Sequence, residues 1–300
     1  MLIHKAIRSL INQKTRAQTK YEIVIVDNCS TDDTKKKVEE ITKTTGDLRI
    51  RYCYEPKLGL SSARNRGVTK AQGTIVAFLD DDAEAAPNWL QEILDSFQRY
   101  PEACGIGGKT APLCDDPKPR WFAGRMLRYL GGHDLGDKDL LLDKKEHPAG
   151  GNMAFKRHLF SAIDGFREDL GRKGQRNSSH EEGELFYRIC ALGKPIYYVP
   201  KVRVFHWQPI ERQRIMELIN IRFNYGKSEA WVDWHGQHKD YVFAKTMKKV
   251  FMSVLTVPSL IPLALSRRTA DVYYVYLTCW FNAGYTVGVL EQILRGGTLK

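Results

Sequence analysis

The sequence feature that most constrains the fold is an apolar run that ends in three consecutive acids, Thr74 to Asp82, TIVAFLDDD. Such a run is typical of a strand buried on both faces, as in a parallel sheet. The acids would then lie at the carboxyl edge of the sheet, where open α/β folds bind ligands. Three adjacent carboxylates repel one another unless they share a cation such as Mg²⁺ or Mn²⁺, which prefers oxygen ligands. A solvated acidic turn ahead of a helix from Pro87 is the alternative, and these residues leave both interpretations open.

The composition indicates a folded protein with an anionic partner. The chain has 300 residues, of which 43% are hydrophobic and 27% charged, so we expect a real core in one large or two smaller domains. The net charge of +11 favours a nucleotide, a nucleic acid or an acidic membrane surface as partner. Residues 201–300 hold 14 basic and 7 acidic side chains, which is +7 of that charge. The six cysteines form no C-x-x-C pair, and no secretory signal opens the chain, which indicates a reduced, cytosolic protein.

Apolar runs and helical periodicity alternate along the first third of the chain, which predicts a doubly wound α/β domain. The predicted strands cover residues 21–27, 48–54, 74–80 and 103–109, and the predicted helices cover 2–12, 31–42, 61–71 and 87–100. Residues 110–146 are rich in Pro, Gly and charge and predict a long loop. Beyond it we expect a strand at 148–155, helices at 156–163, 181–192 and 209–230, and two short strands at 196–199 and 202–207, separated by Pro200.

The tail from residue 231 differs from the rest. Residues 250–265 are apolar between Lys248-Lys249 and Arg267-Arg268, but the run is short for a span and contains Pro258 and Pro262. Residues 272–290 are apolar and aromatic, with Asn282 inside the run. One interpretation is a helical hairpin that lies on a membrane and is held there by its basic flanks. The other is a pair of helices packed on the catalytic domain.

Two further acids, Glu181 and Glu182, follow His180 at the start of a predicted helix. Carboxylates at that position complement the helix dipole, and one of them could equally reach into a cleft as a general base. The zinc-protease pattern H-E-x-x-H is excluded because residue 184 is Glu. The chain contains no P-loop, no G-x-G-x-x-G and no G-x-S-x-G, so the common NTPase, dinucleotide-binding and hydrolase patterns are absent.

The order of the motifs is more specific than any one of them. YEIVIVDNCSTDDT is followed by GLSSARNRGVTKAQGTIVAFLDDDAEAAPNWL, GGNMAFKRHLFSAIDGF, HEEGELFYRICALG and then a His after the last strand. Over about residues 7–230 this resembles the glycosyltransferase family 2 enzymes. The resemblance implies a GT-A fold, with a Rossmann-like mixed sheet flanked by helices, and a metal-dependent, inverting reaction on sugar nucleotides. We therefore expect a catalytic domain over residues 1–230 and a helical hairpin tail over 231–300.

The resemblance also implies roles for individual residues on the donor side. Asp27 would bind the nucleotide base, and Arg64 would lie beside the base or the phosphates. Asp80, Asp81 and Asp82 match the family's D-x-D motif: Asp80 would face the ribose, and Asp82 would hold a divalent Mn or Mg ion that bridges the diphosphate.

Gly151 and Asn152 would line the sugar site, as donor-binding residues or on the acceptor side. Glu181 and Glu182 match the family's E-D pair. Glu182 stands where the family has the Asp base, so it would deprotonate the acceptor hydroxyl. Glu in place of Asp reaches further by one methylene, which leaves Glu181 as the alternative base. His206 would reach the metal or the pyrophosphate, although a lone His on a strand is more often structural.

The resulting expectation is an inverting glycosyltransferase that moves a sugar from a nucleoside-diphosphate sugar to a glycan or lipid-linked acceptor in polysaccharide biosynthesis. It would work at the cytoplasmic face of the plasma membrane, with peripheral contact through residues 241–295 and no nucleic-acid partner. A metal-dependent nucleotidyltransferase, a nucleic-acid-binding protein and an inactive membrane scaffold are the alternatives. One departure matters: the family begins with a central strand that is missing ahead of Leu2, and we expect either an upstream start or a damaged copy.

Overall fold

The computed structural model describes residues 2–47, 49–114, 123–143, 146–172, 180–236, 239–256 and 269–295. The chain divides into two compact units, which are described separately. The first unit contains residues 1–113, 131–174 and 181–207, and the second contains residues 114–130, 175–180 and 208–300.

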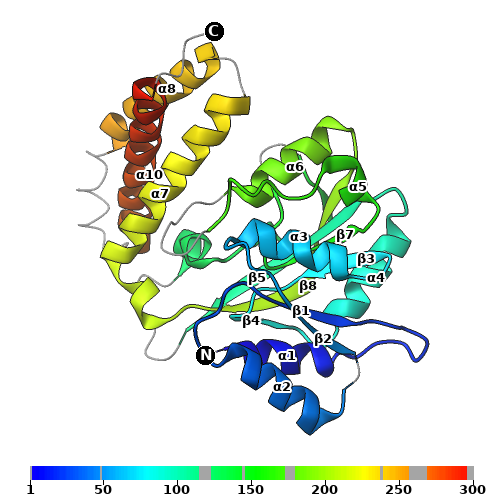
Figure 1. The fold of residues 1–300 in the computed structure, drawn as a ribbon. Coiled ribbons are helices and arrows are strands. Elements are labelled where there is room, and N and C mark those ends of the chain that lie inside the picture. The colour runs from blue at the N-terminus through cyan, green and yellow to red at the C-terminus, as the bar shows by residue number, and fades with distance from the viewer. Residues whose placement is uncertain are drawn as a thin grey trace. The chain divides into compact units, whose positions relative to one another are not determined.

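The first unit confirms the predicted alternation of helices and strands (Figure 1). Its helices are α1 (Ile3–Ile11), α2 (Thr34–Thr45), α3 (Leu60–Lys70), α4 (Trp89–Arg99), α5 (Leu159–Ile163) and α6 (Glu181–Ala191). Its strands are β1 (Ile23–Asp27), β2 (Ile50–Tyr54), β3 (Ile75–Phe78), β4 (Ala83–Ala85), β5 (Gly105–Leu113), β6 (Leu140–Leu141), β7 (Met153–Lys156) and β8 (Ile196–Trp207). β6 falls inside the stretch that was predicted to be a long loop.

The strands form two sheets rather than one. β1 and β2 make a parallel pair, and the other six strands form a sheet of order β3-β7-β5-β8-β4, with β6 paired to β8. β7 is antiparallel to both β3 and β5, whereas β5 and β8 are parallel, so the larger sheet is mixed. The expectation that the strand at residues 74–80 has parallel neighbours was therefore wrong for the described pairing, since its partner β7 is antiparallel. Among the described residues β3 hydrogen-bonds to β7 alone, because β1 does not reach its other edge.

The carboxyl end of β3 continues into a short strand that the sequence did not predict. After Asp82 the chain enters β4, which pairs antiparallel with β8 and sets Ala83 opposite His206. The two strands predicted around Pro200 are one continuous strand, β8, whose register with β5 shifts at Gly108. A Cβ at Gly108 would lie only 1.8 Å from the Val202 carbonyl oxygen, so the irregularity requires glycine there. This register fixes which side chains lie opposite the acids.

Apolar side chains on both faces of the larger sheet form the core of the first unit. On one face Trp89 and Ile93 of α4 pack with Ala77 of β3 and Val204 of β8. On the other face Phe78 of β3 belongs to a cluster with residues of β7, α5 and α6. The carboxyl end of β3, and with it the acids, is thereby held in place by packing on both sides.

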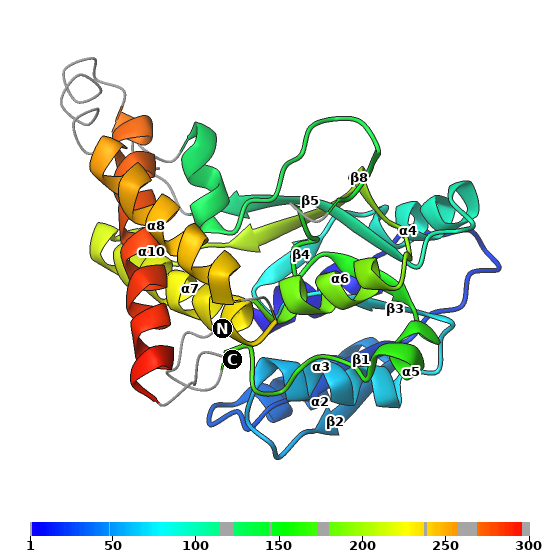
Figure 2. The same cartoon turned by 90° about the horizontal axis from the view of Figure 1, so that it is seen from above.

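The second unit consists of η1 (Gly124–Leu130), η2 (Ile210–Gln213) and three long helices, α7 (Ile215–Gly236), α8 (Lys239–Thr256) and α10 (Thr269–Leu294). Figure 2 shows these three helices side by side. α7 and α10 pack at backbone distance, because a Cβ on Gly226 would lie 2.0 Å from the Phe281 carbonyl oxygen. A Cβ on Gly284 would lie 1.9 Å from the carbonyl oxygen of Phe223. The two helix backbones can come this close only because each helix has a glycine at the contact.

The tail predictions are tested only in part. α8 and α10 supply the two helices of the expected hairpin, whereas Pro258, Pro262 and Arg267-Arg268 lie outside the described residues. Among the helices that the structure does describe, none combines the length and the apolar character that crossing a bilayer requires. The helix predicted at 209–230 begins at Ile215, continues to Gly236 and groups with the tail helices. The functional division at residue 230 stays a prediction.

Candidate active site

Two aspartates and a histidine meet at the carboxyl end of β3. The Asp82 carboxylate lies 2.8 Å from Nε2 of His206, a contact that the β4–β8 pairing sets up. One ligand atom each from Asp80, Asp82 and His206 lie within 4.8 Å of one another. Carboxylate oxygens together with an imidazole nitrogen suit a divalent ion such as Mn²⁺, so these residues fit the expected metal. Asp81, between the two aspartates, is exposed.

Arg64 of α3 connects this cluster to the second acidic pair. Its guanidinium donates to Oε1 of Glu181 at 2.9 Å and lies 3.7 Å from Asp80 and 3.9 Å from Glu182. The Arg64 side chain is only 6% exposed. Although burial opposes its charge, Glu182, Glu181 and Asp80 together raise the pKa of Arg64. One buried cation therefore holds three carboxylates from β3 and α6 in a single site.

Two glycines allow the backbone to enter this cluster. A Cβ on Gly150 would lie 2.3 Å from Oε1 of Glu182 and 2.5 Å from Nη2 of Arg64. A Cβ on Gly151 would lie 2.4 Å from a carboxylate oxygen of Asp80. Gly151 was predicted as a site residue and does lie against Asp80, whereas Gly150 was not singled out, although the GG pair is visible in the sequence. Both positions need a residue without a side chain.

Glu181 and Glu182 have different surroundings. The Glu181 side chain is 3% exposed and that of Glu182 is 21% exposed. Burial, with the charge of Glu182 beside it, raises the pKa of Glu181 to about 8. Burial opposes ionisation of Glu182 too, but Arg64 and His147 outweigh it and lower the pKa of Glu182. At neutral pH the more open carboxylate of the pair is therefore the ionised one.

This asymmetry predicts that the protein loses stability as the pH rises from about 4.5 to about 8. In that range Glu181 keeps its proton in the folded state, whereas in the unfolded chain, with its ordinary pKa of 4.5, it has lost it. Since the folded state binds the extra proton, the free energy of unfolding falls by up to about 1.4 kcal/mol per pH unit. Denaturant titrations across this range measure the slope. Glu181→Gln should flatten the profile, and a wild-type profile that is already flat would contradict the assignment.

Asp27 ends β1 and is 6% exposed. Its carboxylate accepts hydrogen bonds from the Tyr52 hydroxyl at 2.6 Å and from the Ser30 backbone N–H at 2.9 Å. Burial opposes the charge, but these hydrogen bonds more than offset it, and the pKa of Asp27 is lowered. Asp27, Arg64, Asp80 and Asp81 all line one cavity of about 630 Å³, so the predicted donor-side residues share one space. Tyr52 was not foreseen, since a tyrosine in a strand carries no special signal.

Asn152 is held by hydrogen bonds within the protein. Its amide donates to the carbonyl oxygens of Lys109 and Val202, both at 3.0 Å, and accepts from Nε1 of Trp89 at 2.8 Å. The side chain is fully buried. Both amide protons are used within the protein, and the predicted contact of Asn152 with a sugar stays a prediction. Nothing in the sequence marked Trp89 as its partner.

A cluster of carboxylates and an imidazole at the carboxyl edge of an α/β sheet is typical of proteins that bind ligands at that edge. The family model described as glycosyl transferase family 2 matches residues 2–164, which is more than half of the chain. The chain therefore belongs to glycosyl transferase family 2.

Three similar proteins agree with this family. A glucosyl-dolichyl phosphate glucuronosyltransferase of Haloferax volcanii is 28% identical over 188 residues, which cover 62% of this chain and 58% of that protein. A GalNAc(5)-diNAcBac-PP-undecaprenol beta-1,3-glucosyltransferase of Campylobacter jejuni is 36% identical over 96 residues, covering 31% and 29%. The mannosyltransferase PcManGT of Pyrobaculum calidifontis, solved with GDP-Man and Mn²⁺, superposes with a TM-score of 0.59 at 18% identity, covering 99% of this chain and 84% of that one.

The structural likeness confirms the predicted GT-A fold. The chain spans only 58% of the length of the Haloferax relative, so activity and substrates do not transfer directly. The individual roles of the predicted site residues, Asn152 included, remain predictions.

Proposed function

We propose that this protein is an inverting glycosyltransferase that moves a sugar from a nucleoside-diphosphate sugar to the hydroxyl of a glycan or lipid-linked acceptor. The observation that carries the proposal is the position of Arg64, within 4 Å of Asp80 on the donor side and of Glu182 on the other. The lipid-linked acceptors named for the Haloferax and Campylobacter relatives support this acceptor class. The reaction proposed here would serve polysaccharide biosynthesis.

In this mechanism Asp80, Asp82 and His206 would hold a divalent ion, which would supply positive charge for a leaving diphosphate. Asp27 accepts a hydrogen bond from the nucleotide base, and Arg64 orients Asp80 and Glu182. Glu182 removes the proton of the acceptor hydroxyl, the oxygen forms a bond to the anomeric carbon, and the bond from that carbon to the diphosphate breaks. Because base and leaving group lie on opposite faces of the sugar, the anomeric configuration inverts.

A screen of sugar nucleotides by thermal shift, with and without Mn²⁺, tests the donor half of the proposal. We expect one donor to raise the melting temperature only when Mn²⁺ is present. In a transfer assay with that donor, Glu182→Gln should retain donor binding and lose most of the turnover. A nucleotidyltransferase would not need Glu182, so nucleotidyl transfer that persists in this variant, with no sugar transfer by the wild type, would favour that alternative. An inactive scaffold would bind no donor at all.

We propose further that the second unit contacts the cytoplasmic face of a membrane. On α8 an apolar stripe at helical spacing is exposed: Met247, Val250, Phe251, Val254 and Leu255 are each at least 40% exposed. The opposite side of α8 is anchored, because Lys245 pairs with Glu229 at 2.8 Å and Asp233 at 2.6 Å. An exposed apolar stripe beside an excess of basic residues suits an anionic bilayer surface.

Co-sedimentation with anionic phosphatidylglycerol vesicles measures this contact. The double variant Phe251→Glu/Val254→Glu should lower the bound fraction at least about tenfold, because each charge opposes insertion of the stripe. Met216→Glu is the matched control, since Met216 of α7 is 71% exposed but stands outside the stripe. Equal binding by the wild type, the double variant and Met216→Glu would contradict the proposal. So would a dimer in which the stripe is buried.

A further inference from the structure

The second unit has a cavity of its own, which lies along α8. Figure 2 shows α8 beside α10, and one side of α8 together with one residue of α10 lines a cavity of about 540 Å³. The α8 residues recur every three or four positions, so they share one face of the helix over about 16 Å. The described residues that line the cavity are Tyr241, Ala244, Lys245, Lys248, Lys249 and Met252 of α8 and Asn282 of α10.

Three lysines line this cavity, and they are only partly neutralised. Lys245 is bound by Glu229 at 2.8 Å and by Asp233 at 2.6 Å, both on α7. Lys249 lies 3.6 Å from the same Glu229. Lys248 is exposed and pairs with no acid in the part of the chain that the structure describes. Three cations therefore share two carboxylates, which leaves one positive charge in excess at the cavity.

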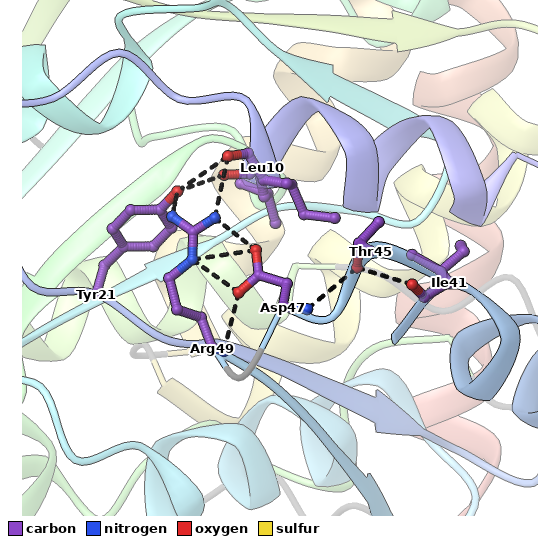
Figure 3. Close-up of polar contacts among 7 residues, drawn as sticks. Leu10, Tyr21, Ile41, Thr45, Asp47 and Arg49 are labelled. Carbon is purple, nitrogen blue, oxygen red and sulfur yellow. Dashed lines mark hydrogen bonds and ion pairs between the residues drawn. The ribbon is translucent and has the colours of Figure 1, made fainter. Parts of the chain in front are cut away.

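Lys249 has weaker counter-charges than another partly buried cation of the chain, Arg49 of the first unit. Figure 3 shows Arg49 against the Asp47 carboxylate, to which it donates at 2.8 Å, and this hydrogen bond raises the pKa of Arg49. The Lys249 side chain is 17% exposed. Burial, together with the charge of Lys245, outweighs Glu229 and lowers the pKa of Lys249. An anion in the cavity would supply the negative charge that Lys249 lacks.

Asn282 adds a hydrogen-bond acceptor to the cavity. Its amide group donates to the Ser253 hydroxyl at 2.9 Å and to the Lys249 carbonyl at 3.3 Å, so both amide protons are used. Among the described residues none donates to the side-chain oxygen of Asn282. Ammonium groups donate to the oxygens of a phosphate, and an amide oxygen accepts from a hydroxyl. The lining therefore suits a phosphate that carries a hydroxyl nearby.

The cavity borders the exposed apolar stripe of α8. Lys248 stands three residues before Phe251 and seven before Leu255, so these side chains follow one ridge of the helix. Phe251 is 61% exposed and Leu255 is 55% exposed. A free phosphate ion would leave this apolar ridge in water. A lipid would place its phosphate among the lysines and its acyl chains along the ridge, so one amphiphilic ligand matches both features.

We propose that this cavity binds the phosphate headgroup of an anionic membrane lipid, with Lys248 and Lys249 at the phosphate and Asn282 as acceptor for a headgroup hydroxyl. The proposal rests on the membrane contact proposed above and goes beyond it. The apolar stripe accounts for attachment to a bilayer of any composition, whereas the cavity selects bilayers with a hydroxyl-bearing anionic headgroup, of which phosphatidylglycerol is an example.

The test measures two affinities by co-sedimentation, one for vesicles that contain phosphatidylglycerol and one for vesicles of pure phosphatidylcholine, and compares their ratio. Ala244→Phe fills the cavity without a change of charge, and Ala244 is exposed, so the fold should survive. We expect this variant to lower the ratio about fivefold, the contribution of one lysine near an anionic surface. Asn220→Phe on α7 is the matched control, since Asn220 is exposed and outside the cavity lining, and it should stay within about twofold of wild type.

Lys248→Gln removes the unpaired charge and should lower the ratio about fivefold as well. Its control is Arg214→Gln, because Arg214 is an exposed basic residue of the same unit that does not line the cavity. The stripe variant Phe251→Glu/Val254→Glu should instead weaken binding to both kinds of vesicle. An unchanged ratio in Ala244→Phe would overturn the proposal and leave the membrane contact in place. Wild-type protein that binds neither kind of vesicle would overturn both.

Inorganic phosphate separates a lipid headgroup from a free anion as the ligand. Titrated at constant ionic strength, it should leave the melting temperature of the wild type unchanged, because it gains nothing from the apolar ridge. If phosphate raises the melting temperature of the wild type and not that of Ala244→Phe, while the wild type shows no preference for phosphatidylglycerol, the cavity takes a free anion and the lipid assignment is overturned.

Discussion

Replacing Asp82 by Asn is expected to abolish the Mn²⁺-dependent stabilisation by a sugar nucleotide and to lower sugar transfer about 100-fold or more, equivalent to about 3 kcal/mol of transition-state stabilisation. The Asp82 carboxylate is hydrogen-bonded to Nε2 of His206 at 2.8 Å. Together with Asp80 these two residues place one ligand atom each within 4.8 Å of one another, which suits a metal ion. Asn can keep a hydrogen bond to His206 but supplies no negative charge to the ion. The fold should therefore survive while the metal-dependent step fails.

Glu84→Gln is the matched control for Asp82→Asn. It removes one negative charge two residues further along, and the amide can still accept the hydrogen bond from Nε1 of Trp207. We expect its donor binding and turnover to stay within about twofold of wild type, since its group is outside the cluster of ligand atoms. An Asp82→Asn protein that keeps its full Mn²⁺-dependent thermal shift would rule out the metal site as assigned.

Replacing Arg64 by Met is expected to have the largest effect on stability. It leaves Glu181, Glu182 and Asp80 without the buried cation that lies within 4 Å of each of them. Removing one partner of a buried ion pair costs about 3–5 kcal/mol. The loss should be largest above pH 8 and smaller at acid pH, because the carboxyl groups can then take up protons instead. Urea unfolding at several pH values measures both the size and the trend.

The control for this change is Arg66→Met on the same helix. The Arg66 side chain is 37% exposed, and its pair with Glu55 is long, at 4.0 Å. Surface pairs of this kind are worth at most about 1 kcal/mol. If Arg64→Met were no more damaging than Arg66→Met, or equally damaging at every pH, Arg64 would not be the cation that binds these acids together.

Much of the first unit could be predicted from local patterns. The helices α1, α3, α4 and α6 and the strands β1, β2 and β3 fall within a few residues of their predicted positions, because hydrophobic periodicity and helix-end signals are local properties. The acids at the ends of β1 and β3 were found by the same reasoning. Neighbouring acids along the chain are visible without any knowledge of the fold.

Pairing partners were not predictable in this way. The sequence does not say that β3 pairs with β7, that β4 aligns Asp82 with His206, or that Pro200 sits within one long strand. Nor does the sequence give the three hydrogen-bond partners of Asn152. These features depend on which distant segments meet, and a single chain carries little local signal for such contacts.

The amino-acid sequence alone determined the α/β class, the acids at strand ends and, through the order of its motifs, the family. Only the tertiary structure decided that one arginine joins the two acidic groups and which glutamate keeps its proton. The reason is physical: hydrophobic period and turn chemistry act over a few residues, whereas charge pairing, burial and strand pairing depend on residues that are far apart in the chain and close in space.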